Sequence, residues 1–206
     1  MKIESIEKYK GSTMCIVLES GEHLYINEEV LAGYGFSENS DCDMAKLRRA
    51  LDEDLRRKAK ERALYLISDR DHSYKELFDK LKKNYGEEIA GDICEKMLEY
   101  GFLDDEKYAK RLAKSMYEYK HFGFRKIRFE LSKKGFEPEV IEEAVYELDG
   151  DEAVEKIKEL IDRKYARYLT DRKGIQKVTN ALARLGHNFG DIKQAIIEYM
   201  EEEEED

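Results

Sequence analysis

The sequence predicts a mainly α-helical protein: three tandem three-helix repeats forming an elongated, curved stack, with a small β-meander element at the N-terminus. Three observations predict this fold. Apolar residues recur at helical spacing from about Met44 onward. A helical motif that ends in glycine recurs three times at nearly constant spacing. Only residues 2–26 show short β-favouring runs separated by glycine-containing turns.

The N-terminal element is predicted from turn residues. Residues 2–26 contain β-favouring runs interrupted at Gly11 and at Gly21, which indicates three short strands in a meander. A short helix is expected at residues 27–35, because Asn27 is a good N-cap and two glutamates follow it at the positive end of the helix. An isolated meander is only marginally stable, so we expect it to pack against the helical part.

The repeat is defined by three motif leucines, Leu81, Leu131 and Leu182, which lie 50 and then 51 residues apart. Each has an apolar residue four positions earlier, which places the pair on one helix face, and a glycine after it that suits a helix C-cap. These companions are Leu77, Ile127 and Val178, followed by Gly86, Gly135 and Gly186. A longer helix precedes each motif and an amphipathic helix follows it, so the repeating unit has three helices.

Helix starts are marked as well. Ser73 and Glu76 have the spacing of a capping box, and Asp104 or Asp105 is expected to cap the first helix of the second unit. Each unit exposes too much apolar surface to stand alone, so neighbouring units are expected to stack. The predicted organisation is an N-terminal element at 1–50, repeats at 51–103, 104–149 and 150–200, and an acidic disordered tail at 201–206.

The repeat motifs carry a resemblance to a known family. The segments "LISDRDHSYKELFDKL", "GFLDDEKYAKRLAKS" and "GFRKIRFELSKKGF" resemble, in order, the first repeat, the junction and the second repeat of the RecX regulatory proteins. The resemblance is strongest from Arg62 to Glu147, and "QKVTNALARLGHNFGDIKQAI" is similar in outline to the third repeat. It implies a cytoplasmic modulator, generally an inhibitor, of the RecA recombinase and its ATP hydrolysis, with a place in DNA repair, DNA recombination and the SOS response. It further implies binding in the groove of the RecA filament on single-stranded DNA.

Charge is segregated along the chain, whose net charge is -10. Residues 107–134 sum to +8 and residues 163–184 to +6, so the remainder carries -10 minus 14, or -24. A positive strip formed by the second and third repeats suits phosphates or an acidic protein groove. The predicted contact residues for the RecA filament or DNA are Arg111, Lys114, Lys120, Arg125, Lys126, Arg128, Lys133, Lys134, Arg167, Arg172 and Lys177.

The same residues leave alternatives open. Lysine-rich helices are often only solvated helices, which would make the chain a passive scaffold. Three-helix units also resemble helix-turn-helix domains, so a second hypothesis is nucleic-acid binding without RecA. The interleaved aromatics Tyr117, Tyr119, Phe122 and Phe124 either stack on bases or pack in the core. Core packing is favoured, because Phe124 and Phe129 flank the helix face of the second-repeat motif.

Enzymatic chemistry is not predicted, and neither is a cofactor or a metal. The four histidines lack Cys or His partners at metal-ligand spacing: His23, His72, His121 and His187. The segment "GYGFSENS" lacks the Gly-Lys-Ser/Thr of a phosphate-binding loop. The pair Asp104 and Asp105 is better explained by helix capping than by acid-base catalysis.

Compartment and assembly follow from what the sequence lacks. No apolar run approaches the roughly 18–20 residues that span a bilayer, and the N-terminus lacks the apolar stretch of a signal peptide. The cysteines, Cys15, Cys42 and Cys94, are odd in number and widely separated, which favours reduced thiols. We therefore predict a cytoplasmic monomer whose contact with naked DNA is at most weak.

Overall fold

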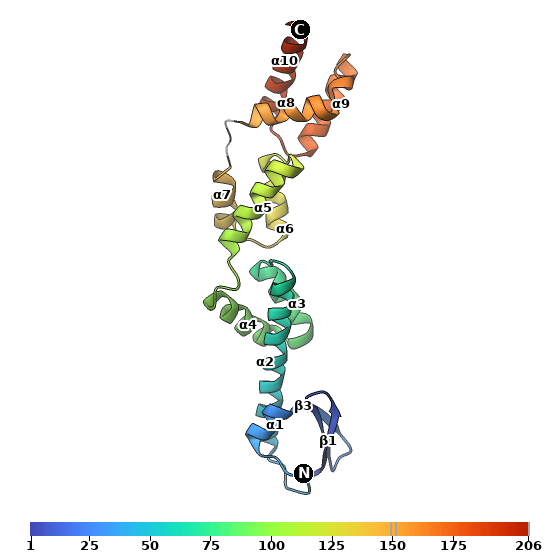
Figure 1. Cartoon of the computed structure of the whole chain (residues 1–206), viewed down its shortest axis with the longest axis vertical. Coiled ribbons are helices and arrows are strands. Elements are labelled where there is room, and N and C mark those ends of the chain that lie inside the picture. Colours follow the sequence, from blue (N-terminus) through green and yellow to red (C-terminus); the bar gives the residue numbers. More distant parts are fainter. Residues whose placement is uncertain (149, 151, 206) are drawn as a thin grey trace. The chain divides into compact units, whose positions relative to one another are not determined.

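The computed structural model describes residues 1–148, 150 and 152–205 and confirms the mainly helical fold with a small β-sheet (Figure 1). The elements are, in chain order, β1 Ile3–Lys10, β2 Thr13–Leu18, β3 His23–Asn27, α1 Glu28–Tyr34, α2 Met44–Asp69, α3 Tyr74–Tyr85, α4 Glu87–Glu99, α5 Asp105–Lys120, α6 Phe124–Lys133, α7 Pro138–Tyr146, α8 Ala153–Lys164, the 3₁₀ helix η1 Ala166–Tyr168, α9 Arg172–Arg184 and α10 Phe189–Glu205. The chain divides into two compact units, one formed by residues 1–70 with 77–99 and the other by residues 71–76 with the described residues from 100 onward.

In the first unit the three strands form an antiparallel meander in the order β1-β2-β3. Ile16 of β2 pairs with Ile6 on one side and with Leu24 on the other. Ile16 is fully buried in a cluster that also contains Leu47 and Ala50 of α2. Burial of this one face stabilises the sheet, which confirms that the meander packs against helices.

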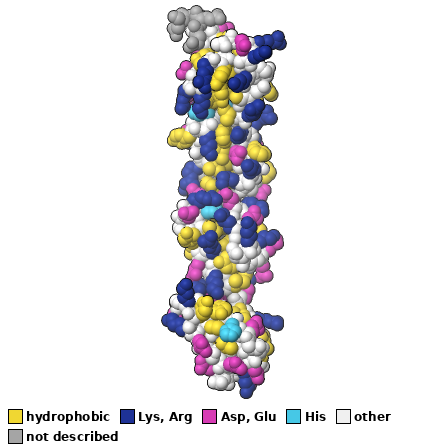
Figure 2. Space-filling view, turned by 90° about the vertical axis from the view of Figure 1, so that its right-hand side faces the viewer, with side chains coloured by type: hydrophobic (Ala, Val, Ile, Leu, Met, Phe, Trp, Pro, Cys, Tyr) yellow, Lys and Arg dark blue, Asp and Glu magenta, His cyan; other side chains and the backbone are white. Residues whose placement is uncertain are grey.

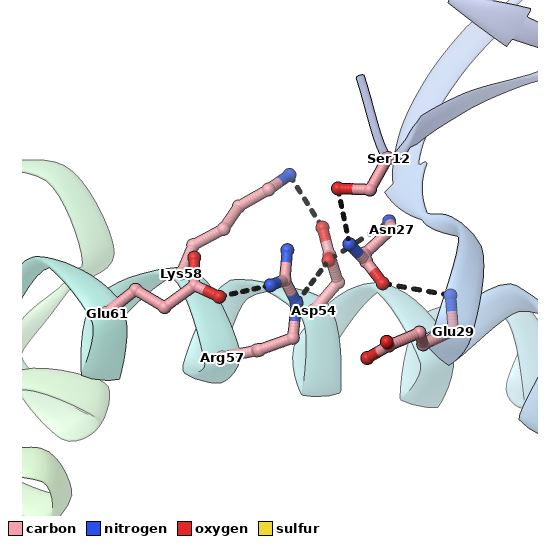
Figure 3. A network of polar contacts seen from close by, with 7 residues as sticks. All are labelled: Ser12, Asn27, Glu29, Asp54, Arg57, Lys58 and Glu61. Atoms are coloured by element: carbon pink, nitrogen blue, oxygen red, sulfur yellow. Dashed lines mark hydrogen bonds and ion pairs between the residues drawn. The ribbon is translucent and has the colours of Figure 1, made fainter. Parts of the chain in front are cut away.

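A buried carboxylate joins the meander, α1 and α2 (Figure 3). Asp54 of α2 is only 2% exposed; it lies 2.6 Å from the Lys58 ammonium and accepts a hydrogen bond of 3.1 Å from the backbone N–H of Asn27. The Asn27 side chain caps α1 by accepting from the backbone N–H of Glu29 at 2.9 Å, and it donates to the Ser12 hydroxyl at 3.1 Å. The predicted cap is therefore confirmed, and the cap residue also bonds to the turn between β1 and β2.

Helix α2 crosses the boundary predicted at 50/51. It runs without a break from Met44 to Asp69 and contains neither glycine nor proline. Leu47 and Ala50, in its N-terminal half, belong to the core of the meander, while the helix goes on to pack against α4. The N-terminal element and the first repeat therefore share one helix, because nothing in its sequence stops helix propagation.

The repeat register is confirmed by burial. Leu81, Leu131 and Leu182 are each 0% exposed. The glycines that follow each motif adopt positive φ angles, as expected of left-handed C-caps. Repeat two (α5, α6 and α7) and repeat three (α8, η1, α9 and α10) each enclose their own apolar cluster within the second unit.

Caps at two repeat starts match the sequence as well. The Ser73 hydroxyl accepts from the Glu76 backbone N–H at 3.1 Å, and the Glu76 carboxylate accepts from the Ser73 backbone N–H at 3.3 Å, which completes the capping box. Of the two candidate aspartates, Asp104 caps α5, with its carboxylate accepting from the Lys107 backbone N–H at 2.8 Å.

The C-terminal acidic segment differs from its prediction. Disorder is expected from residue 201, yet α10 continues to Glu205. Lys158 of α8 forms ion pairs with Glu198 and Glu202, which ties the end of α10 to the third repeat, and glutamate is a good helix former. Asp206 lies outside the described residues, as does Asp149 at the predicted boundary between repeats two and three.

Candidate partner-binding surface

The predicted contact residues divide by whether a carboxylate of this chain already neutralises their charge. Five of the eleven form ion pairs: Arg111 with Asp71, Lys114 with Glu118, Arg128 with Glu142, Lys133 with Glu130, and Lys134 with Glu76. The contacts of Lys114 and Lys133 are long, at 3.8 Å each. The positive strip of the sequence is therefore partly neutralised by carboxylates from the same helices, from neighbouring helices and from the loop before α3.

Two of these pairs have a structural role. Arg128 of α6 donates through Nε and a terminal nitrogen to both carboxylate oxygens of Glu142 on α7, at 2.8–3.1 Å. The hydrogen bond from Arg128 lowers the pKa of Glu142. Lys134 lies 2.9 Å from the Glu76 carboxylate, and its carbonyl accepts from the Ser73 hydroxyl at 2.6 Å. These contacts join α6 to α7 and the end of α6 to the start of α3. Arg128 and Lys134 are therefore already neutralised within the chain.

A large hollow beside α5 is neutralised in the same way. It encloses about 530 Å³ and is lined by four cations of α5, namely Lys107, Lys110, Arg111 and Lys114. Lys110 lies 2.8 Å from both Glu143 and Glu147, and hydrogen bonds to these carboxylates raise the pKa of Lys110. Volume alone therefore does not make this hollow an anion site.

The other six predicted residues form no ion pair with a carboxylate of the described chain: Lys120, Arg125, Lys126, Arg167, Arg172 and Lys177. Four of them lie over aromatic rings instead. The Lys126 ammonium lies 4.5 Å from the centre of the Phe122 ring, and Lys177 lies 4.4 Å from that of Tyr168. Lys120 and Arg167 approach the same two rings. Such contacts orient a cation without cancelling its charge.

Arg125 and Lys126 of α6 meet Arg184 of α9 in one groove. This α6–α9 groove encloses about 390 Å³ and is lined by Arg125, Lys126, Phe129, Glu130, Ala183, Arg184 and Gly186. Arg184 is absent from the predicted contact residues. The repeat spacing could have identified Arg184, because it lies 51 residues after Lys133, which is one of the predicted contact residues.

The groove exists because repeats two and three meet backbone to backbone. The Gly123 N–H donates to the Leu185 carbonyl at 2.8 Å, and the Arg125 N–H donates to the Gly186 carbonyl at 3.3 Å. A Cβ on Gly123 would lie only 2.3 Å from the Gly186 carbonyl carbon, so only glycine permits this approach. The start of α6 is thereby held against the end of α9.

Core packing is confirmed for three of the four interleaved aromatics and is wrong for Tyr119. Tyr117 is buried, and Phe122 and Phe124 pack partly buried against the core of repeat two. Tyr119 is 78% exposed, however, and Phe129 is 59% exposed beside the groove. Phe129 points outward because it lies two residues from the buried positions of α6, roughly on the opposite side of a helix with 3.6 residues per turn. Figure 2 shows Lys and Arg side chains flanking exposed hydrophobic side chains over the C-terminal part of the chain.

Two histidines lie at the same junction. His187 is 7% exposed, and its Nε2 donates to the carbonyl of His121 at 3.0 Å, while the His121 ring lies 3.3 Å from the Arg163 guanidinium. Burial lowers the pKa of both histidines, and for His121 the charge of Arg163 lowers it further. The nearby Asp191 carboxylate acts in the opposite direction on His187.

We expect the second unit to lose stability as the solution is acidified from about pH 7.5 to about pH 5.5. A histidine whose folded pKa is lowered binds protons more readily in the unfolded state, so stability is greatest above the unfolded pKa of about 6.5 and falls below it. Melting temperatures measured by circular dichroism across this range check the slope. His187→Gln should flatten this slope; an equal slope in the wild type and the variant contradicts the assignment.

Comparison with known proteins supplies the family. Three family models match in order: the first three-helix domain of RecX at residues 59–97, the second at 104–145 and the third at 151–196. The regulatory protein RecX of Clostridioides difficile is 27% identical over all of this chain and 97% of its own length. That of Trichlorobacter lovleyi is 29% identical over 78% of this chain and 96% of its own length.

Solved structures agree with this match. A crystal structure of a regulatory protein RecX superposes with a TM-score of 0.70 over 94% of this chain and 98% of its own, at 24% identity, which shows the shared fold. RecX from Lactobacillus salivarius gives 0.66 at 27% identity, over 71% of this chain and 97% of its own. In the described part of the chain, no helix has both the length and the apolar character needed to cross a bilayer. Three consecutive domain matches and full-length relatives together establish that the chain belongs to the RecX family of regulatory proteins.

Proposed function

We propose that this chain binds the RecA filament on single-stranded DNA and inhibits its recombinase and ATPase activities. The observation that carries the proposal is the α6–α9 groove, where three cations that have no ion-pair partner among the described residues gather in a chain of net charge -10. Unneutralised charge at one place on an acidic protein suits an anionic partner. Membership of a family of regulatory proteins supports a role in control rather than catalysis.

The repeats offer a way to bind a filament. Lys126 of repeat two and Lys177 of repeat three are separated by the repeat spacing of 51 residues, and each lies over an aromatic ring. A filament presents the same surface at regular intervals, so equivalent cations on successive repeats can meet successive subunits. The second contact then forms at high effective concentration, and modest contacts add up to useful affinity. Restraining neighbouring subunits in this way accounts for inhibition.

Reversing the charge of the groove should abolish the inhibition. In the variant Arg125→Glu/Lys126→Glu/Arg184→Glu, the attraction to an anionic surface becomes repulsion. Helicity and melting temperature should change little, because these residues form no ion pair within the part of the chain that the structure describes. Surface charges contribute only about 0–1 kcal/mol each. Arg128 is left intact, since its reversal would also break the pair with Glu142.

The measurement is RecA ATP hydrolysis on single-stranded DNA with increasing amounts of each protein. A matched control, Lys80→Glu/Lys83→Glu/Lys96→Glu, makes the same change in net charge at exposed positions of repeat one and should still inhibit. Full inhibition by the groove variant would remove this surface from the mechanism. No effect of the wild-type chain on ATP hydrolysis would refute the proposed function itself.

A second candidate is nucleic-acid binding without RecA. It is favoured by the exposed rings of Tyr119 and Phe129, which lie on helices rich in cations and resemble base-stacking platforms. A salt titration with naked single-stranded DNA separates the two candidates. Tight binding at physiological salt with a steep slope supports this second function, whereas weak binding supports the filament as the target.

A further inference from the structure

We infer that the α6–α9 groove binds an acidic peptide segment that carries a large apolar side chain. Its carboxylates would be held by Arg125, Lys126 and Arg184, and its apolar side chain would rest on Phe129. The inference rests on the proposed function, because it assigns the chemistry of the partner segment that docks at the same surface.

The positive charges of the groove favour a ligand from another molecule over a contact within the chain. The chain contains 47 Asp and Glu residues, and these neutralise Arg128 and Lys134 nearby. Arg125 and Arg184, in contrast, are exposed and have no ion-pair partner among the described residues. Arginine binds carboxylates through two parallel N–H···O bonds, so two guanidinium groups from two helices can each hold one carboxylate in a fixed geometry.

The groove also has an apolar part. Phe129 is 59% exposed, and Ala183 of the facing helix lines the same groove. An exposed phenylalanine gains free energy when a partner's side chain covers it, and aromatic and arginine side chains are typical of the residues that dominate interface affinity. Cations and an exposed ring in one groove therefore favour a segment in which acidic residues flank an apolar one.

The Glu130 carboxylate and the net charge of the chain favour a peptide over a nucleic acid. Glu130 lines the groove, and the chain as a whole is strongly acidic. A nucleic-acid strand carries a phosphate at every nucleotide, so the phosphates beyond the groove would be repelled by Glu130 and by the acidic chain. A short acidic segment can place all of its carboxylates within the groove. Phe129 is also the single aromatic ring among the described residues that line this groove, whereas proteins that bind single-stranded nucleic acids stack successive bases on several aromatic rings.

The two sides of the groove are already fixed in place. Backbone hydrogen bonds from Gly123 to Leu185 and from Arg125 to Gly186 join α6 and α9 at its end. The Lys126 side chain is oriented by the Phe122 ring. Because these groups are held before binding, less conformational entropy is lost when a segment docks.

The test uses the full chain and a fluorescein-labelled synthetic peptide of Asp and Glu residues with one central Phe, followed by fluorescence anisotropy. Arg125→Glu and Arg184→Glu should each weaken binding by about tenfold or more, which corresponds to 1.4 kcal/mol. Phe129→Ser in the protein and Ser for Phe in the peptide should weaken it similarly, with little further loss when combined, because each removes the same contact. Lys193→Glu, an exposed reversal on α10, should bind like the wild type.

Three results would overturn the inference: peptide affinity unchanged by Arg125→Glu and Arg184→Glu, equal affinity for the peptide lacking Phe, or displacement of the peptide by an equally charged oligothymidylate that binds more tightly. The last result would assign the groove to nucleic acid. The assay contains no RecA, so failure of peptide binding and failure of RecA inhibition are measured separately. A chain that binds the peptide through the groove without affecting RecA ATP hydrolysis would refute the proposed function alone.

Discussion

Leu131→Ala should lower the free energy of unfolding of the second unit by about 2–5 kcal/mol, the usual cost of emptying a leucine site in a packed core. Leu131 is 0% exposed and lies in the apolar cluster of repeat two, with Ile127 one helical turn before it. Alanine removes the contacts of the buried side chain and leaves a cavity. Urea unfolding followed by circular dichroism measures the change.

The neighbouring Phe129 provides the comparison. Phe129 lies two residues away on the same helix and is 59% exposed, so Phe129→Ala should cost less than about 1 kcal/mol. The two substitutions together test which face of α6 packs inward. A loss below about 1 kcal/mol for Leu131→Ala, or a larger loss for Phe129→Ala, would mean that the repeat register is wrong.

Gly186→Ala should cost roughly 2–5 kcal/mol and loosen the junction between repeats two and three. Its φ angle of +91° disfavours any residue with a Cβ, and that Cβ would lie 2.4 Å from the backbone nitrogen of Lys126. The start of α6 must then move away from α9. Hydrogen exchange should accordingly show loss of protection at the Gly123 and Arg125 amides, which donate across the junction.

Gly91→Ala is the matched control. Gly91 lies inside α4, and a Cβ there would meet no atom within 4 Å. Alanine should therefore stabilise that helix by roughly 0.5–1 kcal/mol, since it removes the helix penalty of glycine. An equally benign effect of Gly186→Ala, with the Gly123 amide still protected, would show that the junction tolerates a side chain and is not the close contact described above.

The position of a cation in the fold, and not its presence in a basic segment, determines whether a carboxylate of the chain already neutralises it. Arg128 and Arg125 lie on the same helix and belong to the same basic run of sequence. Arg128 is held by Glu142, whereas Arg125 faces the α6–α9 groove with its charge unneutralised. Local sequence could not separate them, because Glu142 comes from the next helix and Arg184 from another repeat.

The sequence by itself was enough for everything that depends on near neighbours in the chain. Leucine spacing placed the buried face of each motif helix, since positions four apart always share a face. Asn27, Ser73 and Asp104 cap helices as predicted, because a cap involves residues only two or three positions apart. The predicted boundary at 50/51 falls inside α2, and the predicted tail from residue 201 continues α10, because neither segment contains a glycine or proline that would end a helix.

Only the tertiary structure decided which positive charges are neutralised by a carboxylate of the chain. Lys134 meets Glu76 across 58 residues, and Arg184 joins Arg125 because two glycines let the backbones of α6 and α9 touch. Coulomb attraction depends on distance in space, which composition and periodicity do not encode. The sequence thus established three helical repeats and their family resemblance, while the tertiary structure determined which cations have a carboxylate partner among the described residues.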